Sequence, residues 1–303
     1  MLEQIARLRR SSAALDSSPL TFDGGGHYRI EIPSVETLAA FDIAVKEATR
    51  REVPIHRISQ GSGIMLLTDE ELAGYAQLGA AHHIEVCLFV GPRAAWDGAS
   101  PSRATAEGAA IGARNVGLAS LHGALSDVYR AVDHGIRSVL VADEGLMALI
   151  AKAKTEGSLP ADLIVKASAL MGISNPYSAE VIHRIGADSI NIPAETSLPE
   201  LAAFRSVTDG VLDLYVEGPD SLGGFLRYHD IAEIIRVAAP VYVKFGLRNV
   251  VPMYPTGSHL HAMAEQTTVE RIRRAAIGLE HLARAGTDLK VDKSCDRAGI
   301  PVA

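Results

Sequence analysis

The feature that most constrains the fold is a regular alternation of short apolar runs and amphipathic segments along most of the chain. Runs with the two-residue period of a strand are followed by stretches with the period of a helix, and this pattern occurs eight times. The expected strands are 28–32, 53–59, 84–90, 136–142, 163–167, 189–192, 211–216 and 241–245. The expected helices are 35–51, 68–82, 121–134, 146–155, 176–185, 198–207, 230–238 and 267–285.

Strands that alternate with helices indicate parallel βαβ connections, and eight units within about 260 residues fit a closed barrel better than an open sheet. A dinucleotide-binding open sheet would carry its glycines after the first strand, whereas Gly24–Gly26 precede it. We therefore predict an α/β fold made of a single (β/α)8 TIM barrel over 1–303, although 303 residues also suit two average domains. Residues 1–26 are expected to form an N-terminal helix and the loop that leads into the barrel, and 287–303 a C-terminal tail.

Composition narrows the class of protein. Apolar residues make up 48% of the chain and charged residues 21%, which is ordinary for a globular protein and excludes disorder or a coiled coil over the whole chain. The net charge of −7 argues against a nucleic-acid partner, because an acidic surface repels phosphate. The N-terminus lacks the apolar core of a secretory signal, and no apolar run reaches about 18 residues. We therefore expect a cytoplasmic protein that acts on a small molecule and has no membrane partner.

Two cysteines, Cys87 and Cys295, limit the cofactors. Two thiols cannot supply the four ligands of an ordinary iron–sulfur cluster or of a cysteine-rich zinc site, and these two form no CxxC pair. Cys87 lies in the apolar run 84–90 and is expected to be a buried thiol. We predict no cofactor and no iron–sulfur cluster, and a divalent metal stays open as an alternative.

Two connections are longer than the others: 91–116 after the third strand and 247–266 after the eighth. Both follow strands, so both belong to the C-terminal face of the barrel, where barrel enzymes have their active sites. Long loops at that face are often functional, and we expect at least one to act as a lid. The alternative is a docking surface for a second subunit, which leaves a homo-oligomer open.

Polar residues alternate with apolar ones in several strands. The faces that helices cover must be apolar, so the polar rows are expected to point into the barrel. The expected inward set is Arg29, Glu31, Lys166, Ser168, Asn191, Tyr215, Glu217, Tyr242 and Lys244. Buried charges are costly unless they are paired, so one interpretation is a structural layer of salt bridges. The other is that lysines and carboxylates near the strand ends are tuned for proton transfer or nucleophilic attack.

The catalytic interpretation assigns definite roles. Glu217 is the expected general base, and Lys244 or Lys166 is expected to polarise a carbonyl or to form a Schiff base. Glu31 belongs to the same catalytic group. Substrate binding, with arginines that clamp an anionic group, is assigned to Arg29, Arg57, Arg93, Ser168, Asn191, Glu195 and Arg248. A metal, if one is present, would take its oxygen ligands from Glu31, Asp143, Glu195 and Glu217.

From the fourth strand onward, over about 80 residues, the chain resembles the barrel of peptidase family U32. Residues 141–145 (VADEG) are similar to that family's VaDxG strand end. Residues 168–175 (SALMGISN) are similar to its StQxsvtN stretch, with Leu170 in place of the Gln.

Two further stretches extend the resemblance. Residues 186–200 resemble the family's GasrvvlaRElsleE, with Glu195 at the Glu position and Ala194 where the family has Arg. Residues 212–218 stand where the family has lEvFvHGa, with Glu217 in place of the His.

The resemblance implies the same barrel with its active-site face, and the family name implies a hydrolase. Many members carry cysteines that bind an iron–sulfur cluster, and some take part in RNA or quinone hydroxylation. This chain has no cysteine between Cys87 and Cys295, so it resembles a divergent member without the cluster.

We predict a barrel enzyme that acts on a small anionic or polyhydroxylated metabolite, by acid–base or Schiff-base chemistry next to a carbonyl, as a lyase or an isomerase. One alternative is a hydrolase of the U32 peptidase type, with or without assistance from a metal. The other is a barrel that binds a ligand without catalysis.

Overall fold

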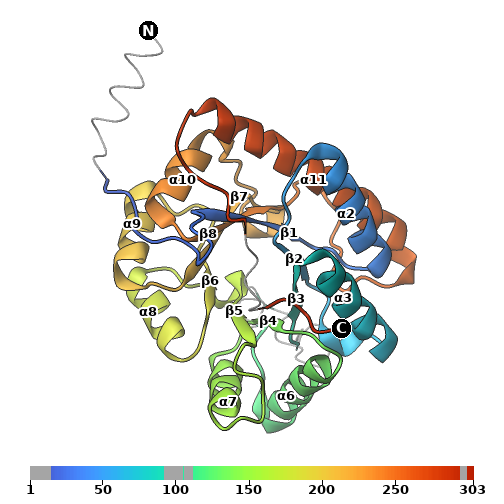
Figure 1. Cartoon of the computed structure of the whole chain (residues 1–303). Coiled ribbons are helices and arrows are strands. Elements are labelled where there is room, and N and C mark those ends of the chain that lie inside the picture. The colour runs from blue at the N-terminus through green and yellow to red at the C-terminus, as the bar shows by residue number, and fades with distance from the viewer. Residues whose placement is uncertain (1–14, 92–104, 106–111, 294–298) are drawn as a thin grey trace.

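The computed structural model describes residues 15–91, 105, 112–293 and 299–303. Within them, eight parallel strands follow one another around a closed barrel, and the last strand pairs with the first. The strands are β1 (Tyr28–Pro33), β2 (Arg57–Gln60), β3 (Glu85–Phe89), β4 (Ser138–Val141), β5 (Ile164–Ala167), β6 (Ser189–Asn191), β7 (Val211–Glu217) and β8 (Val241–Phe245). Figure 1 shows them around a central axis with the helices outside. The predicted (β/α)8 barrel is confirmed.

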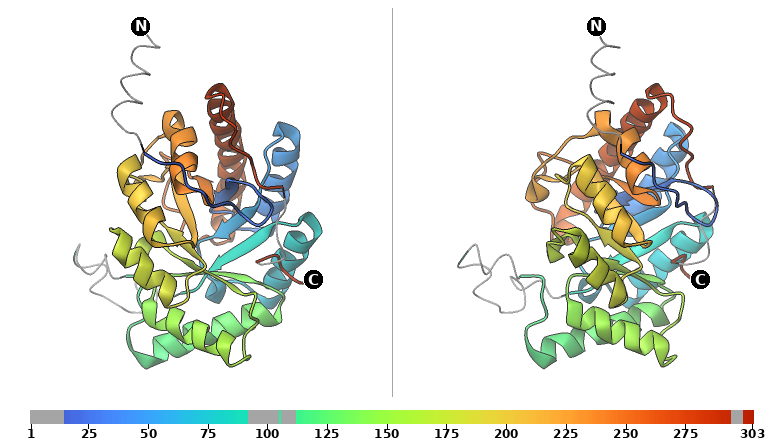
Figure 2. Two further views of the ribbon diagram at one scale, coloured as in Figure 1. Left: turned by 60° about the vertical axis from the view of Figure 1, so that its left-hand side comes forward. Right: turned by 90° about the vertical axis from the view of Figure 1, so that its left-hand side faces the viewer.

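The helices flank the strands, as the two side views in Figure 2 show. They are α2 (Leu38–Arg51), α3 (Asp69–His82), α6 (Gly117–Asp133), α7 (Glu144–Thr155), α8 (Pro176–Arg184), α9 (Leu198–Val207), α10 (Ile231–Ala238) and α11 (His261–Arg284). Short 3-10 turns are η1 (Ile64–Leu66), η2 (Ala169–Met171), η3 (Asp220–Leu222), η4 (Tyr228–Asp230) and η5 (Ser258–Leu260). Among the described residues, no helix combines the length and the hydropathy needed to cross a membrane.

Two predicted boundaries concern the long connections. Helix α11 begins at His261 rather than at 267, so the connection after β8 covers 246–260. The connection after β3 falls mostly outside the described residues, as does the expected N-terminal helix.

Side-chain caps define the first turns of α2, α3, α7, α8 and α9, whereas α6, α10 and α11 have no side-chain cap. Thr68 caps α3 by accepting a hydrogen bond from the backbone N of Glu71 at 3.2 Å, and Glu71 Oε2 accepts one from the backbone N of Thr68 at 2.8 Å. Asn175 accepts from the backbone N of Ser178 at 3.0 Å, with Pro176 in the first turn of α8. At the capped helices, the strand-to-helix loop therefore ends at a defined residue.

The outward faces of the strands form one continuous apolar layer against the helices. Its fully buried members include Ile30, Ile58, Val86, Val139, Val165, Ile190, Leu212 and Val243. Burial of each such side chain contributes roughly 1.5–3 kcal/mol relative to exposure. Because strand side chains alternate, this layer forces the neighbouring residues of each strand into the barrel interior. One of these is Cys87, a buried thiol as predicted, and burial raises the pKa of this thiol to about 11.

The N-terminal end of the barrel is closed by segments from both ends of the chain. Arg29 pairs with Asp292 at 2.7 Å, and its guanidinium lies 4.2 Å from the ring centroid of Phe22. Val291 forms a parallel bridge with Tyr28, so part of the predicted C-terminal tail joins the barrel. Arg29 therefore lies at the opposite end from the strand carboxyl ends. The sequence prediction that Arg29 binds substrate is wrong in its geometry, because the strand pattern gives the side that a residue faces but not what closes the barrel below it.

Candidate active site

A cavity of about 420 Å³ lies at the carboxyl ends of the strands, where barrel enzymes bind their substrates. Its polar lining comes from Ser34, Ser168, Asn191, Tyr215, Asp220, Ser221, Lys244, Tyr254 and Arg271. Its apolar lining includes Phe89, Leu140, Leu170, Leu222, Leu247, Val250, Val251 and Met253. The connection after β8 thus supplies much of the wall. The expected role of one long connection as a lid stays a prediction.

A larger hollow of about 650 Å³ lies elsewhere on the surface, lined by residues of α2 and the N-terminal strand ends. Its charged lining residue Glu52 and its histidine His82 are both exposed, and no buried charged side chain reaches it. The smaller cavity has the buried polar groups that chemistry requires, so we take it as the candidate active site.

Lys244 lies at the floor of this cavity with 3% of its surface exposed. Its Nζ donates a 2.5 Å hydrogen bond to Oδ1 of Asn191 and lies 3.4 Å from Oε1 of Glu31. The same atom lies 4.2 Å from the ring centroid of Tyr215, a cation–π arrangement. An oxygen acceptor, a carboxylate and an aromatic face all favour the charged ammonium over the neutral amine.

Arg271 of α11 and Tyr215 of β7 extend the polar floor. Nη1 of Arg271 donates to the backbone O of Ser34 and to Oγ1 of Thr267, each at 3.2 Å. Burial lowers the pKa of Arg271 and raises the pKa of Tyr215. The cavity therefore has two cations, Lys244 and Arg271, on a floor with a neutral phenol, and this combination attracts anionic ligands.

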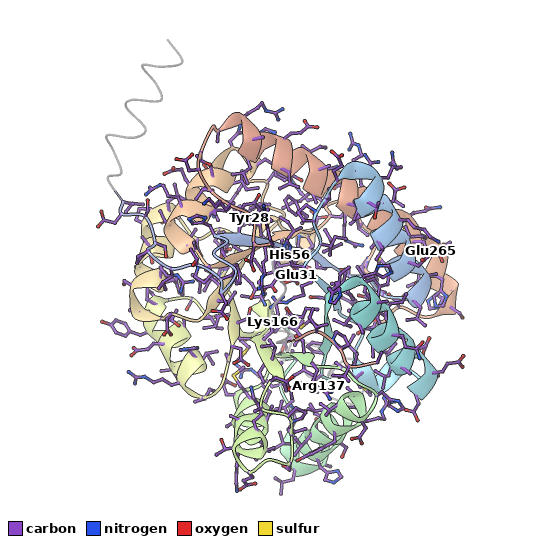
Figure 3. The ribbon with its side chains drawn as sticks, in the orientation of Figure 1. Tyr28, Glu31, His56, Arg137, Lys166 and Glu265 are labelled. Atoms are coloured by element: carbon purple, nitrogen blue, oxygen red, sulfur yellow. The ribbon has the colours of Figure 1, made fainter. Side chains whose placement is uncertain are left out.

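Below the floor lies a fully buried layer of ion pairs. Glu31 pairs with Lys166 and with Arg57, the latter at 3.2 Å, and accepts a 2.6 Å hydrogen bond from Ser59. Asp213 lies 2.7 Å from Nη1 of Arg57 and 3.3 Å from Nζ of Lys166. Figure 3 shows Glu31 and Lys166 near the barrel axis, well inside the ring of helices.

The layer is balanced in formal charge. Nε of Arg57 lies 2.8 Å from Glu85, so three carboxylates (Glu31, Glu85, Asp213) face three cations (Arg57, Lys166, Lys244). Burial raises the pKa of Glu31, but the charges of Lys166, Lys244 and Arg57 outweigh burial and hold this pKa well below its usual value of 4.5. The individual groups of the layer are charged, but their formal charges sum to zero. Such pairing offsets the cost of burying charges in a low-dielectric interior.

Lys166 and Arg57 have structural partners on every side. Lys166 is 0% exposed, engages two carboxylates and does not line the cavity, and Arg57 is 2% exposed and engages three. The geometry therefore favours the salt-bridge interpretation for these two residues over the predicted Schiff-base and substrate-binding roles.

Glu217 does not point into the barrel, contrary to the sequence prediction. The register between β7 and β8 shifts between Tyr215 and Glu217, which pairs Glu217 with the outward-facing Phe245. Its carboxylate accepts a hydrogen bond from the hydroxyl of Tyr228 and lies 3.6 Å from Nη1 of Arg274 on α11. A β-bulge of this kind adds one residue and reverses the face of everything beyond it. The predicted general base therefore lies behind the cavity wall.

The other predicted site residues have different positions. Ser168 and Asn191 line the cavity, Glu195 is exposed, and Arg248 lies at the rim with Nε 3.3 Å from Asp220. Asp143 caps α7 by accepting from the backbone N of Leu146 at 2.8 Å. Arg93 lies outside the described residues.

The carboxylates proposed as metal ligands are not brought together. Glu31 belongs to the ion-pair layer, Asp143 caps a helix, Glu195 is exposed and Glu217 contacts Tyr228. In the described part of the chain, no three histidine, cysteine, aspartate or glutamate side chains are grouped as metal ligands would be.

Sequence reasoning missed three residues at the site: Arg271 and Glu36, which are buried, and Tyr254, which is 42% exposed. Glu36 accepts hydrogen bonds from the backbone N of Gly61 at 2.8 Å and of Ser62 at 3.0 Å, and burial raises its pKa. Gly61 lines the cavity, so Glu36 holds one wall in place. Arg271 stands among Arg273 and Arg274 in a helix, and only a consistent helical phase with buried Ile272 and Ala275 could have singled it out.

The comparisons with known proteins concern the fold alone. No model of a known protein family matches the chain, and no curated protein matches it. A U32 peptidase structure shares 20% identity over 66% of this chain and 73% of its own, with a TM-score of 0.43. A 3-hexulose-6-phosphate synthase shares 15% over 82% and 97% (TM-score 0.41), and a thiamine phosphate pyrophosphorylase from Pyrococcus furiosus 13% over 85% and 98% (TM-score 0.44). At these values the likeness concerns the barrel alone, so the U32 resemblance stays a resemblance.

Proposed function

We propose that the protein is a barrel enzyme that activates the carbon next to a carbonyl group in a small anionic metabolite. Lys244 is the activating group, and the cavity at the carboxyl ends of the strands is the substrate site. The observation that carries the proposal is the buried Lys244 side chain at the cavity floor, held between Asn191 and Glu31. The reaction belongs to the lyase or isomerase type.

The surroundings of Lys244 support activation by the charged ammonium. A substrate carbonyl oxygen that accepts a hydrogen bond from Nζ would gain electrophilic character, and negative charge that develops on this oxygen as an enolate forms would meet a fixed cation. The ammonium is positioned before substrate arrives, because Asn191 and the ring of Tyr215 already orient it. Such preorganised charge in a dry site is worth several kcal/mol, roughly two to three orders of magnitude in rate.

A Schiff base at Lys244 is the covalent variant of the same role. The neutral amine would attack the carbonyl carbon, form a C–N bond and release water, and the protonated imine would then accept the electron pair of the adjacent C–H or C–C bond. This variant requires the ammonium to lose a proton first. Glu31, the nearest carboxylate, is a weak proton acceptor because its pKa lies well below 4.5. The contacts of Lys244 therefore support the ammonium role more strongly.

A ligand-binding barrel without catalysis is the second candidate, and one observation favours it. Among the described residues, the carboxylate that lines the cavity is Asp220, and it already accepts a 2.6 Å hydrogen bond from the backbone N of Asn249 and lies 3.3 Å from Arg248. A general base at the floor is thus not supplied by a carboxylate of this part of the chain. The hydrolase alternative has less support, since its carboxylates are dispersed.

Exchange of substrate protons for deuterium tests the proposed function directly. The protein is incubated in D2O with a panel of small anionic carbonyl compounds, and loss of the proton NMR signal next to the carbonyl is followed. The wild-type protein should accelerate exchange for at least one compound, and Lys244→Met should lower the rate at least about 100-fold, since removal of one preorganised donor has this effect. Lys152→Met is the matched control, because Lys152 is 68% exposed on α7.

The outcomes separate the candidates. Binding of a compound without accelerated exchange would favour the non-catalytic barrel. Treatment with borohydride then distinguishes the two roles of Lys244: a reduced adduct on the peptide that contains Lys244 indicates the Schiff base, and exchange without an adduct indicates the ammonium role.

A further inference from the structure

Arg271 is a buried cation that forms no ion pair with a described residue, although the charges of Glu36 and Glu217 favour its charged form. It is 4% exposed, and no carboxylate of the described residues lies within ion-pair distance of its guanidinium. Both of its hydrogen bonds come from Nη1, to the backbone O of Ser34 and to Oγ1 of Thr267. Its Nε is buried and has no hydrogen-bond partner among the described residues.

Arg205 shows how this fold satisfies a buried arginine when it serves structure alone. Its Nε donates to the backbone O of Ala238 at 3.3 Å, Nη1 donates to Thr208 and Gly210, and Nη2 donates to Ala238 and Pro240. Every nitrogen of that guanidinium has an acceptor. Arg271 leaves one edge of its guanidinium, the edge formed by Nε and Nη2, without an acceptor among the described residues.

The unpartnered atom belongs to a cavity residue. The buried side-chain atoms without hydrogen-bond partners in the described residues are Nε of Arg57, Nδ2 of Asn115, Oε1 of Glu217 and Nε of Arg271, and of these Nε of Arg57 has an ion pair with Glu85 at 2.8 Å. Arg271 lines the cavity, and the other three residues do not. Glu36 and Glu217 offset the burial of this cation without an ion pair, so an anion that enters the cavity would gain pairing energy with Arg271.

We propose that Arg271 anchors the carboxylate of a small oxo acid whose carbonyl group lies at Lys244. A carboxylate matches the Nε–Nη2 edge of a guanidinium with two parallel hydrogen bonds. The inference rests on the proposed function, and it names the substrate class of the same cavity.

The remaining walls define the rest of the substrate. Leu140, Leu170, Leu247, Val250 and Met253 line the cavity and offer no hydrogen-bonding side chains, whereas hydroxyl groups come from Ser34, Ser168, Ser221 and Tyr254. A sugar-like chain against the apolar part of the lining would bury hydroxyl groups without partners, at about 1–3 kcal/mol for each group. The apolar part of the lining favours oxo acids with a hydrocarbon side chain within the predicted "anionic or polyhydroxylated" class.

Binding measurements with matched ligands test the anchor. The probes are 4-methyl-2-oxopentanoate, its methyl ester and dihydroxyacetone phosphate, titrated by calorimetry into the full chain. The wild-type protein should bind the acid at least about tenfold more tightly than the ester, because a hydrogen-bonded charge pair is worth this factor or more. It should also prefer the acid to the phosphate, since the apolar part of the lining suits a hydrocarbon chain and a phosphate dianion would meet Asp220 at the wall.

Variants assign the preference to one side chain. Arg271→Gln should lower affinity for the acid about tenfold and leave affinity for the ester unchanged, and Arg271→Lys should lie between. Arg273→Gln is the control, because Arg273 is 50% exposed on the same helix. Equal wild-type affinity for acid and ester would overturn the anchor, as would an acid preference that survives in a folded Arg271→Gln protein. If Arg271→Gln does not fold, the wild-type comparison decides alone.

Failure of the anchor and failure of the proposed function give different results. Acid-selective binding that depends on Arg271, without any proton exchange, would support the carboxylate anchor and contradict the proposed enzymatic activity. Proton exchange in a neutral ketone at the same rate as in the matching acid would support the proposed enzymatic activity and contradict the role of Arg271 as a carboxylate anchor.

Discussion

Lys244 and Asn191 form a directed pair at the floor of the cavity. Nζ of Lys244 donates to Oδ1 of Asn191 at 2.5 Å, and Nδ2 of the same amide donates to the backbone O of Ala167 at 2.7 Å. The second bond fixes the amide with its oxygen toward the lysine. Strands β5, β6 and β8 thus act together on the position of one ammonium group.

The first prediction concerns this pair. Asn191→Ala should slow Lys244-dependent proton exchange about tenfold and lower the free energy of unfolding by about 2 kcal/mol, because the ammonium and the Ala167 carbonyl each lose a buried partner. Exchange kinetics and chemical denaturation measure the two effects. Ser174→Ala, an exposed change, is the control. A variant that exchanges protons at the wild-type rate would show that Asn191 does not position Lys244.

Glu31 is predicted to be essential to the buried ion-pair layer. Glu31→Gln leaves Lys166, Lys244 and Arg57 with one counter-charge fewer, so the free energy of unfolding should fall by about 3 kcal/mol. Glu265→Gln is the control: Figure 3 shows Glu265 on the outer helix ring, and a change there should stay within about 0.5 kcal/mol. Equal free energies of unfolding for the two variants would contradict the prediction that Glu31 stabilises the ion-pair layer.

The same carboxylate predicts a pH dependence at the acid end. The folded pKa of Glu31 lies well below its usual value of 4.5, so its stabilising contribution is present above pH 4.5 and is lost as the pH falls through the folded pKa. The free energy of unfolding should therefore decline below about pH 4.5, and the decline should be smaller in Glu31→Gln. Denaturation at a series of pH values measures both slopes, and parallel slopes would argue against the shift.

His56 predicts a separate step at higher pH. Its Nδ1 accepts from the backbone N of Ile30 at 3.0 Å and its Nε2 lies 2.8 Å from the backbone O of Asp292, and burial is the main cause of a pKa below its usual 6.5. A lowered folded pKa means that the stabilisation is present above pH 6.5 and is lost as the pH falls below it. The difference in stability between wild type and His56→Gln should shrink between pH 7 and 5, whereas the exposed His122→Gln control should show no such trend.

Two helical glycines make a matched pair. A Cβ at Gly278 of α11 would lie 2.3 Å from the ring of Phe245, whereas a Cβ at Gly123 of α6 would meet nothing within 4 Å. Gly278→Ala should lower the free energy of unfolding by about 2 kcal/mol through overpacking, and Gly123→Ala should raise it by about 0.5–1 kcal/mol through helix propensity. Thermal denaturation measures both. The same sign for both variants would contradict the close packing of α11 on the barrel.

The sequence predicted the barrel because strand and helix periods repeat locally. It also predicted that Glu31, Lys166 and Lys244 point inward, since alternation along a strand needs no knowledge of its neighbours. It could not predict which of these charges pair. Arg57 and Lys244 meet Glu31 through the register of adjacent strands, and Lys166 reaches Glu31 from across the barrel.

The positions of Glu217 and Arg271 were not predicted, and both depend on how elements pack against one another. Glu217 was predicted to continue the inward row of β7, and one bulge turned it toward Tyr228 and Arg274. Arg271 comes from a helix, so the rule that searches strand ends for site residues passes over it. Both require the register between elements, which no local pattern contains.

A crystal structure of the protein soaked with 4-methyl-2-oxopentanoate tests the central claim most directly. The account predicts ligand density in the cavity at the carboxyl ends of the strands, with the carbonyl oxygen within hydrogen-bond distance of Nζ of Lys244 and the carboxylate on Nε and Nη2 of Arg271. Density for the ligand at another place on the molecule, or in this cavity with neither side chain in contact, would contradict it.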